Sequence, residues 1–335
     1  MTRLKSTYAF ELPWLIHEGL AGLALRYCSP LQLSQDVISG LQDWASAYSA
    51  QWLTWTGSWK KVLTQLDQPV VLKGVALCDW LYDEPALRPV GDLDILIPWP
   101  RRQQASTELQ KLGFAPEIAL DEDLVMTQQR FTLRRPGRLS CHIDLHWASS
   151  NRSLLANALP HCLLAKHRRK TGLGLQPPVA LLHAAAHLMG HHKDHSSLKW
   201  LMDIHLLWES MDSAQRAAVT DLAVRRQIAP IVSATLTRCA TVMGTRHTEI
   251  ALVQLYRFRH QPCRHYLQGQ LTVLQDLAAQ PGIQQKLRYL KQTTFPDPNY
   301  MAAIGMPSGA VGYLKRLIGG VGKARRLTRP SDKHS

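Results

Sequence analysis

Several patterns that would identify a common class of protein are missing from this chain of 335 residues. The six cysteines are scattered and form no CxxC pair, which argues against a zinc site or a dithiol redox motif. No HExxH or GxSxG segment occurs, so nothing supports a zinc protease or a serine hydrolase. Scattered cysteines of this kind are typical of reduced, mostly buried thiols, and we expect a cytoplasmic protein.

Long apolar runs are missing as well. A membrane-spanning helix needs roughly 18–20 apolar residues in a row. The nearest approach, residues 301–322, contains Pro307 and Lys315 and is expected to form a loop and a short helix. Near the N-terminus, Glu11 and Glu18 interrupt the apolar residues, which makes a poor signal peptide. We therefore expect no transmembrane segment.

Acidic residues are scarce relative to basic ones. Asp and Glu total 25 against 39 Lys and Arg, and the formal net charge is +14. This excess favours an anionic partner such as a nucleotide, a nucleic acid or a phosphorylated substrate, although an ordinary solvated surface would also carry such clusters. No recognisable RNA-binding motif accompanies the charge. A hydrophobic content of 45% is sufficient for a globular core, and the length suits two or three domains.

Hydrophobic periodicity predicts helical regions on both sides of a central α/β segment. Residues 1–68 are predicted to be helical, with an aromatic stripe that is more typical of a buried helix face than of a base-stacking surface. The stripe consists of Trp44, Tyr48, Trp52, Trp55 and Trp59. Residues 69–150 are predicted to form the central α/β unit, and residues 151–318 a helical substrate domain with one helix over 249–274. Residues 319–335 are expected to be a basic, flexible tail.

The most specific chemistry lies in residues 70–98, which read as strand, glycine turn, helix, loop and strand. Asp92 and Asp94 are separated by one residue on the second strand, so their side chains point to the same face. Two carboxylates this close repel each other, and a divalent cation between them would remove the cost of burying them. The alternative is that both carboxylates simply face water.

A third carboxylate lies on a later predicted strand, residues 139–147. There, His142, Asp144 and His146 alternate with apolar residues, which predicts one strand face in the core and the other in a cleft. An Asp pair on one strand with a third Asp on a neighbouring strand suits two-metal phosphoryl or nucleotidyl transfer. The turn at Gly74 would let backbone N–H groups approach phosphates closely.

The segments LKG, RPVGDLDILI and HIDLHW, taken together, resemble the uncharacterised nucleotidyltransferases of the DNA polymerase β superfamily. The resemblance covers residues 70–148 and extends more loosely over 179–208, which include WLMDI. It implies an α/β fold with a mixed β-sheet flanked by helices, in which Asp92, Asp94 and Asp144 hold two Mg²⁺ ions. It also implies transfer of NMP from an Mg-NTP such as ATP to an acceptor hydroxyl or phosphate, with release of pyrophosphate.

The turn before the Asp pair departs from the superfamily pattern. Gly74 is followed by Val75, where the superfamily's phosphate turn has a serine. Triphosphate binding is therefore expected to rely on the backbone at Gly74 and on Lys73 or Arg88, although Arg88 could instead brace its loop through an ion pair. The missing serine leaves a second interpretation open, namely a module of the same fold that binds nucleotide, RNA or protein without catalysis.

The C-terminal helical region is expected to supply the acceptor site. Three histidines recur at four-residue spacing from His183 and would share one helix face, but only alanines separate the first two, which disfavours zinc. His187 and Asp203 are candidate acceptor contacts. His146 is a further candidate, with a supporting role beside a carboxylate as its alternative. The acceptor itself, whether a small molecule, a peptide or RNA, is not identified by the sequence.

Overall fold

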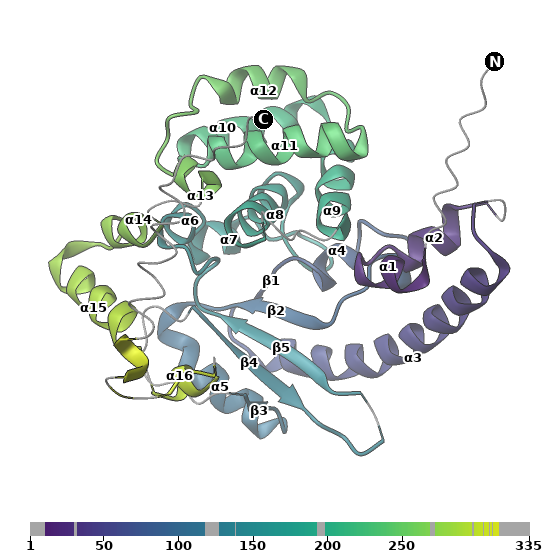
Figure 1. Ribbon diagram of the computed structural model, residues 1–335, viewed down its shortest axis with the longest axis horizontal. Coiled ribbons are helices and arrows are strands. Elements are labelled where there is room, and N and C mark those ends of the chain that lie inside the picture. The colour runs from purple at the N-terminus through teal and green to yellow at the C-terminus, as the bar shows by residue number, and fades with distance from the viewer. Residues whose placement is uncertain are drawn as a thin grey trace, which may run out of the picture.

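The computed structural model describes most of the chain (Figure 1). The described residues are 11–29, 32–117, 127–137, 139–192, 198–268, 272–296, 298–303, 305–307, 309 and 311–314. The predicted tail at 319–335 lies outside them. A mixed β-sheet lies at the centre and helices flank it, which confirms the expected fold class.

The sheet has five strands in the order β1-β2-β5-β4-β3. Their bounds are β1 Val70–Val71, β2 Asp92–Leu96, β3 Ala115–Pro116, β4 Gln128–Leu133 and β5 Cys141–His146. β2 and β5 run parallel, and the other pairs are antiparallel. Asp94 lies opposite Asp144 across the parallel pair, and Arg130 of β4 lies opposite Asp144 on its other side. The register therefore aligns three charged residues across three adjacent strands.

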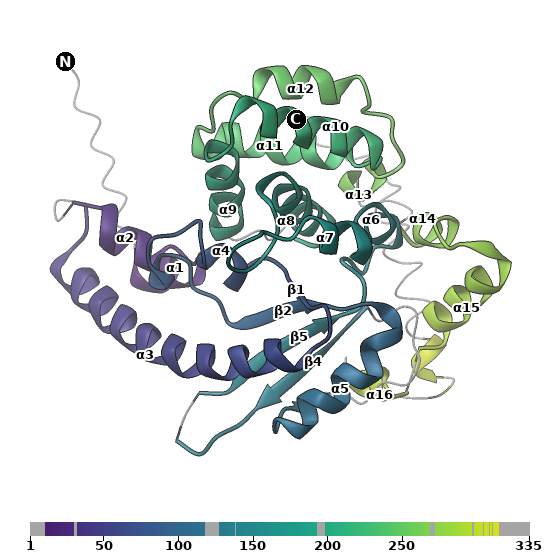
Figure 2. The ribbon, with the colours of Figure 1, turned by 180° about the vertical axis from the view of Figure 1, so that it is seen from behind.

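The described residues of the N-terminal region, 11–29 and 32–68, are mostly helical, as predicted. It contains α1 Leu12–His17, α2 Ala21–Tyr27 and the long α3 Gln35–Gln65, whose N-cap Ser34 accepts from the amide of Val37. α3 runs along one side of the sheet (Figures 1 and 2). Trp55 and Trp59 are buried in one hydrophobic cluster with Leu93 and Ile95 of β2. The later part of the aromatic stripe, Trp52, Trp55 and Trp59, covers the apolar face of the sheet, whereas Trp44 packs against the small cluster of α1 and α2.

Short elements connect the strands. They are α4 Val75–Cys78, the 3₁₀ turns η1 Pro85–Leu87 and η2 Trp99–Arg101, and α5 Arg102–Lys111. α5 buries Ala105 and Leu109 in the same cluster as the α3 tryptophans. This cluster fills one face of the sheet and leaves the opposite face of β2 and β5 to the charged residues.

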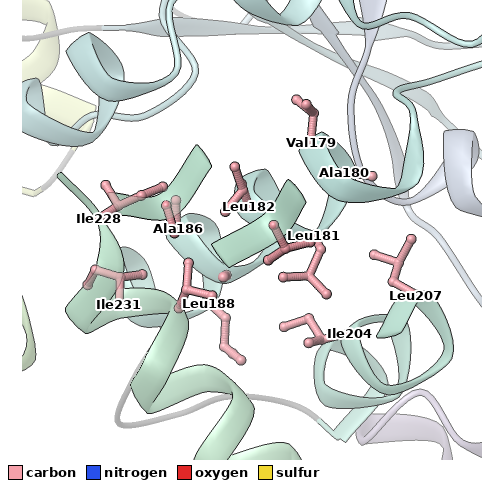
Figure 3. Close-up of a cluster of buried hydrophobic side chains, with 14 of the residues drawn as sticks. Val179, Ala180, Leu181, Leu182, Ala186, Leu188, Ile204, Leu207, Ile228 and Ile231 are labelled. Atoms are coloured by element: carbon pink, nitrogen blue, oxygen red, sulfur yellow. The ribbon is translucent and has the colours of Figure 1, made fainter. Parts of the chain in front are cut away.

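Helices of the C-terminal half form the second and larger core. Buried residues of this core come from α6 Ser153–Ala158, α7 His161–Lys166, α8 Pro177–His191, α9 Leu198–Glu209, α10 Ser213–Arg225, α11 Ala229–Met243, α12 Glu249–Tyr256 and α13 Arg264–Gln268. The helices that follow are α14 Thr272–Ala278, α15 Gly282–Thr294 and α16 Pro298–Ala303. Figure 3 shows α8 side chains such as Leu181 and Leu188 packed with Ile204 and Ile231 of neighbouring helices. Val70 of β1 belongs to the same cluster, so this core includes residues from both sides of the predicted domain boundary at residue 150.

One helix prediction is wrong. The expected single helix over 249–274 is three helices, α12, α13 and α14. Pro262 lies between α12 and α13, and a proline inside a helix lacks the amide hydrogen and collides with the preceding turn. Among the residues described, no helix is both long enough and apolar enough to cross a bilayer.

Candidate active site

A cavity of about 670 Å³ lies between the charged face of the sheet and the helices α8 and α9. Figure 1 shows these two helices on the side of β1 and β2 away from α3. The lining also includes the glycine turn before α4 and the loop 149–152 that follows β5. Among the residues singled out from the sequence, the cavity is lined by Lys73, Gly74, Arg88, Asp92, Asp94, Asp144, His146 and His187.

The three carboxylates converge on this cavity because of strand alternation and register. Asp92 and Asp94 face it from β2, while Leu93 between them is buried on the other face with the α3 tryptophans. Asp144 faces it from β5, directly beside Asp94. Asp94 and Asp144 are buried and Asp92 is partly exposed. The structure thus brings together residues that are about fifty positions apart in the sequence.

Two basic side chains and one histidine contact these carboxylates. Arg130 Nε donates to Asp144 Oδ1 at 2.7 Å, and Arg130 Nη2 donates to Asp92 Oδ2 at 3.0 Å and to Asp144 Oδ2 at 3.1 Å. Lys73 Nζ lies 3.2 Å from Asp94 Oδ1, and His146 Nε2 lies 3.0 Å from the same oxygen. Each carboxylate therefore has a cationic or imidazole partner.

The electrostatics of Asp92 and Asp94 differ. Burial, followed by the charges of Asp94 and Asp144, raises the pKa of Asp92 to about 6. Burial alone would raise the pKa of Asp94 too, but Lys73 and His146 outweigh it and hold that pKa below its ordinary value. The negative charge near Asp92 is thus incompletely balanced by the side chains around it.

The donor set at this end of the sheet suits a hard divalent cation. Asp94, Asp144 and His146 each offer one ligand atom, and these atoms all lie within 4.8 Å of one another. Carboxylate oxygens are the ligands that Mg²⁺ prefers, and Asp92 adds a further one on the same face.

Arg88 and Asp203 form a buried ion pair at the edge of the cavity. Arg88 Nε donates to Asp203 Oδ1 at 2.9 Å and Arg88 Nη2 donates to Asp203 Oδ2 at 2.6 Å, while Tyr82 donates its hydroxyl to Asp203 Oδ1 at 2.7 Å. Arg88 lines the cavity, but only 4% of its side chain is exposed. Asp203 is not among the described residues that line the cavity. Sequence analysis allowed Arg88 either a phosphate contact or an ion pair that braces its loop, and this geometry is that of the ion pair.

Histidines from α8 form the wall opposite the strands. His187 Nε2 lies 3.0 Å from Lys73 Nζ, so α8 contacts the glycine turn directly. The rings of His187 and His192 each pack against Trp200 of α9, with centroid distances of 5.6 and 4.2 Å. His183 is buried, and burial together with Lys73 lowers its pKa to about 3, so it is neutral. The α8 side of the cavity therefore presents imidazole rings, of which the buried His183 is neutral.

Comparison with known protein families finds a match over most of the chain. A family model described as "Uncharacterised nucleotidyltransferase" matches residues 12–244. The chain belongs to this nucleotidyltransferase family. It is also similar to the crystal structure of an antigenic nucleotidyltransferase-like protein from Paracoccidioides brasiliensis, at 16% identity over 58% of this chain and 96% of that chain, with a TM-score of 0.32. A search of curated proteins finds no match.

Membership of the nucleotidyltransferase family confirms the resemblance carried by the three sequence segments. Sequence reasoning nevertheless missed Arg130. A strand pattern identifies which side chains share a face, but Arg130 meets Asp144 only through the register between β4 and β5. The available signal was weak: a basic residue on a strand next to the carboxylate strands of a nucleotidyltransferase.

Proposed function

We propose that this nucleotidyltransferase moves NMP from an Mg-NTP such as ATP to an acceptor hydroxyl or phosphate and releases pyrophosphate. The observation that carries the proposal is the convergence of Asp92, Asp94 and Asp144 on one cavity wall. Side chains that serve only solubility do not converge in this way, because their mutual repulsion opposes folding. The family match supports the same class of reaction.

The residues present fit the metal ions that this reaction uses. Asp92, Asp94 and Asp144 would hold two Mg²⁺ ions, with His146 beside Asp94 orienting that carboxylate. When bound, Mg²⁺ would neutralise charge on the phosphate oxygens and increase the acidity of the attacking hydroxyl. The fit rests on the oxygen donors and on the incompletely balanced charge at Asp92.

The chain's own residues then have separate tasks. Asp144 accepts the proton of the acceptor hydroxyl while the hydroxyl oxygen attacks the α-phosphorus. Pyrophosphate leaves from the opposite side of that phosphorus. The turn at Lys73 and Gly74 lines the cavity, where the Lys73 ammonium and the backbone can bind phosphate oxygens. Gly74 has a φ of +59°, a conformation that suits glycine and keeps the turn open to ligand.

In this proposal, Arg88 and Asp203 affect the nucleotide site indirectly. Their ion pair fixes the loop that leads into β2 and so holds the Asp92 carboxylate in place. The acceptor would bind between the α8 and α9 wall and the sheet. His187 lines the cavity from α8, and His146 lines it from the end of β5. The net charge of +14 suits an anionic acceptor, whether a small molecule, a peptide or RNA.

We also propose a cytoplasmic location. All six cysteines are free thiols, and four of them (Cys78, Cys141, Cys239 and Cys263) are buried. Proteins of oxidising compartments use cysteines mainly as disulfides, whereas reduced, buried thiols are common in the cytosol. Mg-NTP, the proposed substrate, is supplied in the same compartment.

The proposal is tested by conservative replacement of the carboxylates. We expect Asp92→Asn, Asp94→Asn and Asp144→Asn each to lower NMP transfer by at least about 10³-fold, since each removes charge from the metal site. Purified protein is incubated with radiolabelled NTPs and pools of acceptors, and mass spectrometry identifies the products. Asp67→Asn is the matched control, because Asp67 lies outside the cavity and pairs with Arg101 at the surface.

Two outcomes would count against this function. Full activity in the Asp92 or Asp94 variant, at an unchanged melting temperature, would exclude the proposed site. Tight binding of Mg-NTP by the unmodified protein without transfer to any acceptor would instead indicate a binding module of the same fold. Calorimetric titration with Mg-NTP, run beside the transfer assay, distinguishes these results.

A further inference from the structure

Arg130 bridges two of the three carboxylates to which the proposed function assigns metal. Its guanidinium donates three hydrogen bonds to Asp92 and Asp144, at 2.7–3.1 Å, and so bridges carboxylates from two strands. Burial opposes the charged form of Arg130, yet hydrogen bonding to Asp144 and the charges of the carboxylates raise its pKa above the ordinary value. A divalent cation shared by these carboxylates would have to replace the guanidinium.

Arg130 is also well placed to move. Its backbone is fixed in the middle of β4, but 43% of its side chain is exposed. Arg88, Lys73 and Arg152, which also line the cavity, are less accessible, with 4%, 20% and 33% of their side chains exposed. A long side chain on a rigid strand can exchange one partner for another without movement of the fold.

A released guanidinium has an obvious new partner. Guanidinium groups match phosphate oxygens as well as they match carboxylates, because the planar fork donates two parallel hydrogen bonds. A triphosphate in this cavity would place negative charge beside Arg130. Bound metal would at the same time neutralise Asp92 and Asp144.

We infer that Arg130 is a nucleotide-binding residue that metal displaces from the carboxylates. Arg130 pairs with Asp92 and Asp144 in the metal-free protein, and it pairs with the triphosphate once metal is bound to those carboxylates. The inference rests on the proposed function, whose nucleotide and metal it uses. It assigns triphosphate recognition to a residue on β4, in addition to the turn at Lys73 and Gly74. Its distinguishing consequence is that Arg130 opposes binding of metal alone and favours binding of metal-nucleotide.

The test measures both affinities in one variant. In Arg130→Met, we expect Mn²⁺ alone, followed by electron paramagnetic resonance, to bind about tenfold more tightly, because no guanidinium has to be displaced. We expect Mg²⁺-bound α,β-methylene-ATP, followed by calorimetry, to bind about tenfold more weakly. Arg134→Met is the matched control, since Arg134 follows β4, is exposed and does not line the cavity, and both affinities should stay unchanged.

A purely structural role for Arg130 would weaken both affinities together, so the opposite signs identify the exchange. If Arg130→Met does not fold without metal, Arg130→Lys replaces it, and its single-point ammonium should shift both affinities in the same directions by a smaller factor. Mn²⁺ binding that is no tighter than in the unmodified protein overturns the exchange, and undiminished nucleotide binding overturns the assignment to triphosphate. Either result leaves NMP transfer by the unmodified protein intact, whereas failure of the proposed function would appear as absent transfer in that protein.

Discussion

At the scale of single residues, the role of Arg88 depends on a partner far along the chain. The sequence permits either a phosphate clamp or an ion pair, because nothing near Arg88 distinguishes them. The structure pairs it with Asp203, 115 positions away, and burial leaves little of the guanidinium accessible to a ligand. Roles that depend on long-range pairing cannot be read from local spacing, whereas the shared face of Asp92 and Asp94 could be, since it depends only on strand alternation.

The Arg88–Asp203 pair should control stability. We expect Arg88→Met to lower the free energy of unfolding by about 3–5 kcal/mol, because it leaves a buried carboxylate with only the Tyr82 hydroxyl. Replacing both partners, in Arg88→Met with Asp203→Leu, should cost less than the sum of the single changes, because no uncompensated charge remains. Urea unfolding of the four proteins gives the coupling energy. An Arg88→Met protein as stable as the unmodified chain, but weakened in nucleotide binding, would restore the phosphate-clamp reading.

At the scale of secondary-structure elements, periodicity predicted the main features. The aromatic stripe of α3 and the alternation of β5 both came from local pattern, because each reflects one buried face. The single helix expected over 249–274 failed at Pro262, where a local breaker outweighed an apolar pattern. The order and register of β2, β5 and β4 had no local signal, and that register is what creates the Arg130 contact with Asp144.

Two helical glycines give a matched test of how the elements pack. A Cβ at Gly22 of α2 would collide with the carbonyl oxygen of Ala86 in η1, whereas a Cβ at Gly57 of α3 would meet nothing within 4 Å. We expect Gly22→Ala to cost about 1–3 kcal/mol of folding free energy through overpacking. Gly57→Ala should instead gain up to about 1 kcal/mol, because alanine is the better helix former. Thermal and urea unfolding measure both, and a Gly22→Ala protein stabilised like Gly57→Ala would show that α2 does not rest on η1.

At the scale of the whole molecule, the family match ends earlier in the chain than the larger hydrophobic core does. The family model ends at residue 244, but the larger core continues into α12 and α13. Leu255 and Tyr266 are buried in it. α12 packs against α10 and α11, and α13 packs against α11 and against α8, which lines the cavity. Asp276 of α14 then accepts from the amide of Ser153 at 2.7 Å and so joins α14 to the start of α6. The sequence suggested a helical C-terminal region, but which of its helices support the cavity depends on this packing.

The family-matched segment should therefore be unable to fold by itself. A chain ending at residue 244 loses Leu255 and Tyr266, whose burial contributes about 1.5–3 kcal/mol each, and it exposes the apolar surfaces that they cover. Because domains are stable by only about 5–15 kcal/mol in total, we expect this chain to be insoluble or to unfold without cooperativity. A chain ending at residue 280 keeps both side chains and the Asp276 contact, and should unfold cooperatively and still bind Mn²⁺. Calorimetry and metal titration compare the two, and a cooperative, metal-binding chain ending at 244 would show that the cavity does not depend on α12 to α14.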